Sequence, residues 1–118
     1  SGFALGISVV TQDSNNSLIL VITTVSSQEQ ARRIASDLVE QQLVACAQIA
    51  PVESIYRWKD QLQQETEWRL MLKTTASCYK PVESTLIKVH PYELPAIYAV
   101  PVCNALESYD HWVSEQLR

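Results

Sequence analysis

Two long strand-forming segments separated by only two residues constrain this chain more than any other feature of its sequence. The first, Ser54–Trp58, has apolar residues at alternate positions, and the second runs from Gln61 to Thr75. Lys59-Asp60 between them predicts a two-residue hairpin turn. Strands in globular proteins usually have about five to six residues, so this hairpin is expected to reach past a small domain. The unpaired N–H and C=O groups along it favour pairing with another copy of the chain.

The segments before the hairpin predict a strand, a helix and another strand. Leu18–Val25 is rich in β-branched residues and apolar on both faces, which predicts a central strand covered on both sides. Ser26 and Glu29 form a capping box at the start of an amphipathic helix of about 16 residues. Leu43–Ile49 predicts the next strand, and Pro51 predicts a bend or bulge after it.

The segments after the hairpin complete the fold class. A stripe of Val82, Leu86 and Val89 predicts a second helix, which Pro91 closes at the preceding residue. Ile97–Val102 predicts a fourth strand, and a short helix follows with one face made by Tyr109, Trp112, Val113 and Leu117. The order β-α-β-β-α-β plus a C-terminal helix predicts an α+β, ferredoxin-like fold with an antiparallel sheet and its helices on one face.

Length and charge bound the possible functions. The chain has 118 residues, enough for one domain. We expect residues 1–17 to be a flexible N-terminal tail and residues 18–118 to be the folded domain. A net charge of -4 without a Lys/Arg cluster argues against nucleic-acid binding. No apolar run approaches the roughly 20 residues of a membrane span, and residues 1–17 lack a signal-peptide pattern, so we expect a cytoplasmic protein.

The sequence has few of the residue patterns that catalysis or a structural metal site requires. The three cysteines, Cys46, Cys78 and Cys103, are odd in number and have no CxxC spacing, which disfavours a disulfide framework and a structural zinc site. Cys46 with His90 is the only nucleophile–base pairing on offer, and Cys46 lies inside a predicted strand. Both glycines lie in the first 17 residues, so no glycine-rich phosphate loop exists. We therefore do not expect an enzyme.

Five segments, in order, resemble the CutA divalent-cation-tolerance family, from about Leu18 to the end of the chain. They are the helix-to-strand segment 31–46, Ser54-Ile55-Tyr56-x-Trp58, Leu72-Lys73-Thr74, His90-Pro91-Tyr92-Glu93-x-Pro95 and Tyr109-x-x-Trp112. The resemblance implies a ferredoxin-like homotrimer whose long hairpins pair across subunits. It further implies a binding or regulatory role in tolerance to divalent metal ions, with copper binding in some members. The family is also structurally similar to PII signalling proteins, which gives an alternative function: sensing a small ligand at the subunit boundary.

His90 is the strongest candidate metal ligand, because a neutral imidazole suits Cu(II). We expect Glu93 or a neighbouring subunit to add ligands, so Cu(II) or another divalent cation is the candidate cofactor, although none is obligatory. The alternative is structural: His90 closes a helix and hydrogen-bonds locally. Thr23 and Val89 stand where some relatives of the family have a cysteine and a second histidine. His111, the only other histidine, is expected to face solvent.

A second candidate site combines charged and aromatic residues at a subunit boundary. Its members are Lys73, Tyr92, Glu93, Glu67 and Trp58, with Glu65 near them. Lys73 follows the apolar run Leu70-Met71-Leu72, where a buried ammonium needs a partner. One interpretation is a pocket for an anion or small molecule, since ligands favour such boundaries. The other is an ion pair that fixes the register of the trimer.

Overall fold

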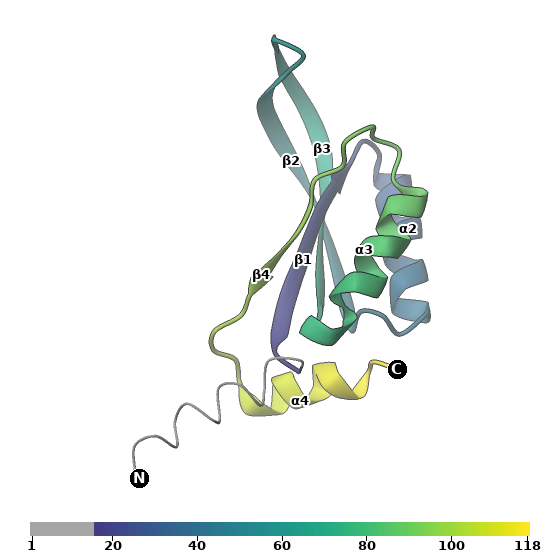
Figure 1. Ribbon diagram of the computed structural model, residues 1–118, viewed down its shortest axis with the longest axis vertical. Coiled ribbons are helices and arrows are strands. Elements are labelled where there is room, and N and C mark those ends of the chain that lie inside the picture. The colour runs from purple at the N-terminus through teal and green to yellow at the C-terminus, as the bar shows by residue number, and fades with distance from the viewer. Residues whose placement is uncertain (1–15) are drawn as a thin grey trace.

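The computed structural model describes residues 16–118, so the tail predicted for residues 1–17 lies almost entirely outside the described residues (Figure 1). Within the described range, Ser17 is anchored, because its carbonyl accepts the N–H of Ala76 at 2.9 Å. The elements in chain order are β1 (Leu18–Val25), α2 (Gln28–Glu40), β2 (Cys46–Trp58), β3 (Gln61–Thr75), the single turn η2 (Ala76–Cys78), α3 (Tyr79–Val89), β4 (Ile97–Pro101) and α4 (Glu107–Glu115).

These elements form the predicted ferredoxin-like fold. The sheet has the strand order β2-β3-β1-β4, and each neighbouring pair is antiparallel. Helices α2 and α3 lie against one face of this sheet, and α4 crosses its lower end beside the start of β1 (Figure 1). None of the helices between residues 16 and 118 is long and apolar enough to cross a bilayer.

The core lies between the sheet and the two long helices. It is made by side chains that alternate along β1 and β3 and by the apolar stripes of α2 and α3. The fully buried members include Val21, Val25, Leu38, Leu70, Leu72, Val82 and Leu86. Burying such side chains contributes about 1.5–3 kcal/mol each. A smaller cluster joins Val113 of α4 to Leu18 and Ala45, which fixes α4 across the end of the sheet.

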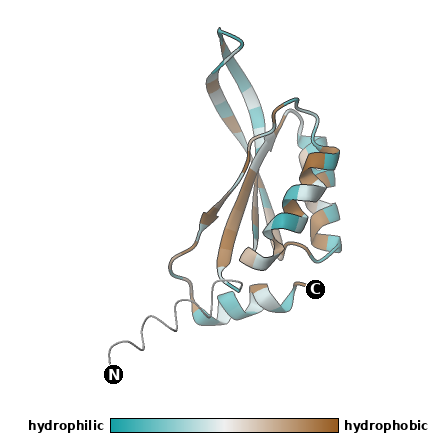
Figure 2. Ribbon diagram, viewed as in Figure 1, coloured by the Kyte–Doolittle hydropathy of each residue, from teal (hydrophilic) through white to brown (hydrophobic). Residues whose placement is uncertain are grey.

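The opposite face of the sheet is uncovered in the single chain. We expected β1 to be buried on both sides, but only its odd-numbered positions face α2 and α3, and on the other side only Leu18 is covered, by α4. Ile22 lies on the uncovered face, where its cross-strand neighbours are Met71 and Tyr98. Tyr98 is 51% exposed and Val100, next to it on the same face of β4, is 40% exposed. We call this apolar surface the open sheet face; apolar residues follow β1 and β4 along it (Figure 2).

The hairpin extends beyond the sheet, as predicted. From Val52↔Glu67 to Trp58↔Gln61, β2 and β3 pair only with each other, because β1 pairs with β3 no further than Trp68. We call this part, residues 52–67, the ribbon. Its turn is formed by Lys59 and Asp60, whose φ angles of 50° and 64° correspond to a type I′ hairpin turn.

Three local predictions were wrong. The first helix is capped by Ser27 rather than Ser26: the Ser27 hydroxyl accepts the N–H of Gln30 at 3.1 Å, and the helix has 13 residues. Pro51 causes no bulge, because β2 is an edge strand and can lose an outward N–H without breaking the ladder. Val89, expected in the buried stripe of α3, is 48% exposed at the end of that helix.

Candidate functional site

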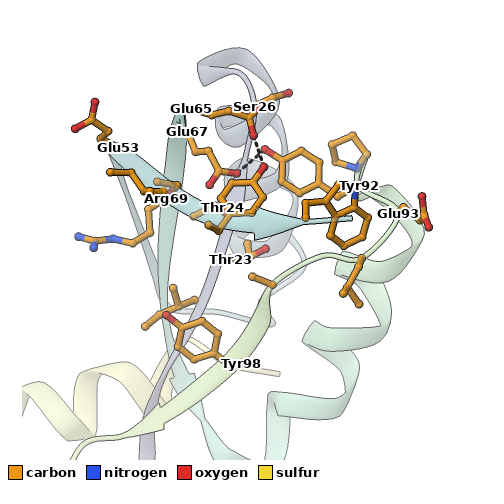
Figure 3. A pocket seen from close by; sticks show the side chains of 18 residues that line it. Thr23, Thr24, Ser26, Glu53, Glu65, Glu67, Arg69, Tyr92, Glu93 and Tyr98 are labelled. Carbon is orange, nitrogen blue, oxygen red and sulfur yellow. Dashed lines mark hydrogen bonds between the residues drawn. The ribbon is translucent and has the colours of Figure 1, made fainter. Parts of the chain in front are cut away.

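An open pocket of about 920 Å³ lies at the base of the ribbon. Its walls come from the ribbon, the end of β1 and the segment 91–96, which passes from α3 to β4 over the top of β1 (Figure 3). The sequence places polar side chains here by simple alternation. Glu65, Glu67 and Arg69 are two residues apart along β3 and therefore share one face of the strand.

Two phenol–carboxylate pairs lie inside this pocket. The hydroxyl of Tyr92 donates to Glu67 Oε2 at 2.7 Å, and the hydroxyl of Tyr56 donates to Glu65 (Figure 3). Glu67 is buried, with 7% of its surface exposed. Burial and the hydrogen bond to Glu67 raise the pKa of Tyr92 well above its ordinary value. The hydrogen bond to Glu65 is the main cause that raises the pKa of Tyr56 to about 12. Both phenols therefore stay protonated and act as donors.

His90 holds the segment 91–96 against the end of β1. It follows α3 in extended backbone geometry, as Pro91 predicts. Its Nδ1 accepts the N–H of Tyr92 at 3.2 Å, so the proton lies on Nε2, which donates to the carbonyl of Thr24 at 2.9 Å and approaches the Thr23 hydroxyl at 3.1 Å. Burial lowers the pKa of His90, which keeps the imidazole neutral.

The candidate metal ligands are not brought together in the chain. Both nitrogens of His90 have protein partners, so a metal would have to displace one of them. The Glu93 carboxylate turns instead to Lys59, with Oε1 3.8 Å from Nζ. His111 is an exposed partner of Glu115 at 3.3 Å. Residues 16–118 contain no group of three or more His, Cys, Asp or Glu side chains that could hold a metal ion. Copper binding through His90 and Glu93 stays a prediction.

The second candidate site is brought together except for Lys73. Trp58, Glu67, Tyr92 and Glu93 all line the pocket. Lys73 lies six residues beyond Glu67 on the same strand, a separation of about 20 Å at the rise of a β-strand. Its ammonium lies 5.5 Å from the centroid of the Tyr109 ring instead.

Cys46 and His90 also lie apart. Cys46 is opposite Lys73, and Lys73 is opposite Leu20, which is four residues along β1 from the Thr24 carbonyl that His90 contacts. The pairing that we considered for nucleophilic catalysis therefore has no geometric basis within one chain.

The sequence reasoning missed most of the residues that line the pocket, including three with large polar or aromatic side chains. Tyr56, Arg69 and Tyr98 line the pocket, and all three could have been found from the period of two along their strands. The guanidinium of Arg69 points away from the phenol–carboxylate pairs (Figure 3). Its Nε is buried and has no hydrogen-bond partner among the residues that the structure describes.

Known proteins resemble the chain over most of its length. The family model described as "CutA1 divalent ion tolerance protein" matches residues 19–116. The "Divalent-cation tolerance protein CutA" of Thermotoga maritima is 38% identical over 100 residues, which are 85% of this chain and 99% of that protein. A plant relative, "Protein CutA, chloroplastic" of Arabidopsis thaliana, is 31% identical over 101 residues, or 85% of this chain and 56% of that protein.

Solved structures give the same result. The divalent cation tolerance protein of Thermus thermophilus superposes with a TM-score of 0.82 at 36% identity, covering 86% of this chain and 99% of that one. A structure from Archaeoglobus fulgidus, described as a periplasmic divalent cation tolerance protein CutA, has a TM-score of 0.83 at 30% identity and covers 86% of this chain and 99% of that one.

Proposed function

The chain belongs to the CutA1 divalent ion tolerance family, and from this membership we propose that it works as a homotrimeric binding or regulatory protein in tolerance to divalent metal ions. The observation that carries the trimer is the ribbon. Ile55 and Leu62 within it are 62% and 72% exposed, and nothing in the described part of the chain covers them. Strand edges and apolar side chains of this length are normally buried by a partner.

The open sheet face supports the same assembly. Ile22, Tyr98 and Val100 form a contiguous apolar strip on β1 and β4. A monomer rarely leaves such a strip to solvent, because each Å² of apolar surface removed from water stabilises by about 25 cal/mol. The outer edges of β2 and β4 are also unpaired within residues 16–118. Three copies that share these edges and faces would satisfy both.

The assembly is tested by the mass of the protein in solution. We expect sedimentation equilibrium at micromolar concentration to give about three times the chain mass of 13.3 kDa. A well-folded species at the mass of a single chain would contradict the proposal, because the ribbon would then be stable without a partner.

We propose that the protein acts by binding and not by turnover, and that it does so in the cytoplasm. In support, two phenols and two carboxylates of the pocket form two hydrogen-bonded pairs, and neither pair supplies a nucleophile with a base beside it.

The alternative, a PII-like protein that senses a small ligand at the subunit boundary, is favoured by one observation. The pocket of about 920 Å³ has an open mouth at the base of the ribbon, where a neighbouring subunit would come closest.

Copper binding through His90 has its own test. Cu(II) is titrated against the metal-free protein and against His90→Ala, with His111→Ala as the matched control. If His90 and Glu93 hold the ion, His90→Ala weakens binding about tenfold or more and His111→Ala does not. An ion held by His90 would have to displace one of the two protein partners of its nitrogens, and equal, weak binding to all three proteins would remove His90 as a ligand.

A further inference from the structure

The pocket at the base of the ribbon has an unbalanced charge. Glu65 and Glu67 place two carboxylates inside it, whereas the carboxylates of Glu53 and Glu93 turn outwards from its walls (Figure 3). The one cationic side chain of its walls, that of Arg69, points away from the phenol–carboxylate pairs. Within residues 16–118, only Glu93 of these four has an ion-pair partner closer than 4 Å. Glu65 and Glu67 accept hydrogen bonds from phenols, which are neutral donors and leave the negative charge uncancelled.

Aromatic rings form much of the same wall. Tyr56, Trp58 and Tyr92 line the pocket away from the open sheet face, and the face of an aromatic ring attracts a cation by about 0.5–1 kcal/mol when exposed and by more when water is excluded. A pocket that combines carboxylates with aromatic rings is suited to binding an organic cation. The nearby apolar side chain of Leu94 would contact an uncharged stem.

A lysine of the chain itself makes both kinds of contact at the edge of the pocket. The ammonium of Lys59, at the tip of the ribbon, lies 5.6 Å from the centroid of the Trp58 ring and 3.8 Å from Glu93 Oε1. Trp58 and Glu93 are both wall residues, whereas the Lys59 side chain is 69% exposed and free to move aside. An amine of the chain itself thus lies between a ring and a carboxylate of this wall.

A bare metal ion fits this arrangement poorly. The carboxylates lie around the hollow without converging on one point, and residues 16–118 contain no cluster of three metal-ligating side chains. An anion is disfavoured as well, because the guanidinium of Arg69 points away from the phenol–carboxylate pairs (Figure 3). Within the boundary-pocket function proposed above, on which this inference rests, we propose that the pocket binds a small organic cation: an amine carried on an apolar stem.

The test compares three probes of similar shape and different charge. Phenylethylamine, phenylethanol and phenylpropionate are titrated against the purified, full-length trimer, and binding is followed by NMR line shifts of the pocket tyrosines. We expect the amine to bind in the millimolar range or better, and the alcohol and the acid at least about tenfold more weakly. The affinity for the amine should fall as salt is added, because screening weakens charge attraction. Equal affinity for all three probes, preference for the acid, or no binding of the amine would overturn the proposal.

A matched pair of variants locates the effect. Glu67→Gln removes the charge and keeps an oxygen that accepts from Tyr92, so we expect amine affinity to drop about tenfold. Glu40→Gln, at an exposed position of α2, makes the same charge change far from the pocket and should leave affinity unaltered. If Glu67→Gln alters the assembly, Glu65→Gln replaces it. Sedimentation of the same samples separates the two proposals: an intact trimer that ignores amines contradicts this inference alone, and a monomer contradicts the trimer itself.

Discussion

Replacing Ile22 with glutamate is expected to break the proposed trimer into single chains at micromolar concentration. Ile22 lies in the middle of the open sheet face, between Met71 and Tyr98 on the neighbouring strands. An interface that covers this face would have to bury the new carboxylate without a partner, which costs several kcal/mol per copy. The same residue is only half-buried in the isolated chain, so the fold of each subunit should survive.

Sedimentation velocity measures the outcome, and circular dichroism checks that the fold is kept. Ile87→Glu is the matched control, because Ile87 is 59% exposed on α3, on the helical side of the molecule. We expect that variant to sediment like the parent protein. A trimeric Ile22→Glu protein would mean that the open sheet face is not the contact between copies.

Replacing His90 with phenylalanine is expected to lower the free energy of unfolding by about 1–3 kcal/mol at neutral pH. The ring is kept, but the Thr24 carbonyl loses its donor and the Tyr92 N–H loses its acceptor. Leaving a buried polar group without its partner costs about that much. Urea unfolding of the two proteins measures the difference, and His111→Phe is the control on an exposed helix surface.

The pH dependence of this difference has a definite sign. Burial lowers the pKa of folded His90 below its ordinary value of 6.5, so below pH 6.5 the unfolded chain binds more protons at this site than the folded chain. The contribution of His90 to stability is therefore complete above pH 6.5 and is lost as the pH falls towards the folded pKa. We expect the advantage of the parent protein over His90→Phe to shrink on acidification. An advantage that grew instead would show that folded His90 is protonated.

Much of the fold could be predicted because its signals are local. Alternation in 61–75 and helical spacing in 28–40 each mark one buried face, and Lys59-Asp60 leaves room for only one kind of turn. The N-cap was misplaced by one residue because two adjacent serines are equally good caps, and only the course of the chain after β1 decides between them. The open sheet face was missed because its strand is apolar on both faces. That sequence pattern is the same whether the second face is covered by elements of the same chain or by a neighbouring chain.

The pocket could be predicted only in part, for a different reason. Tyr92 and Glu67 were expected in the same site, and the structure joins them by a hydrogen bond. Lys73 was added on the strength of its charge, although its distance along β3 from Glu67 already excluded it from the same small hollow. The roles of the two nitrogens of His90 depend on Thr24, 66 residues away in the chain, and no local pattern carries that contact.

The ribbon also affects how readily a newly made chain aggregates. Before the proposed assembly forms, Ile55 and Leu62 face water on a two-stranded extension, and exposed apolar strands of this kind can begin aggregation. In the proposed trimer, the encounter with two other copies depends on concentration, so this exposure would last longest when the protein is scarce. Arg57, Lys59 and Asp60 place charges of both signs at the tip, and charged side chains on a bare strand edge discourage stacking with unrelated chains. The tip thus protects solubility during the interval before assembly.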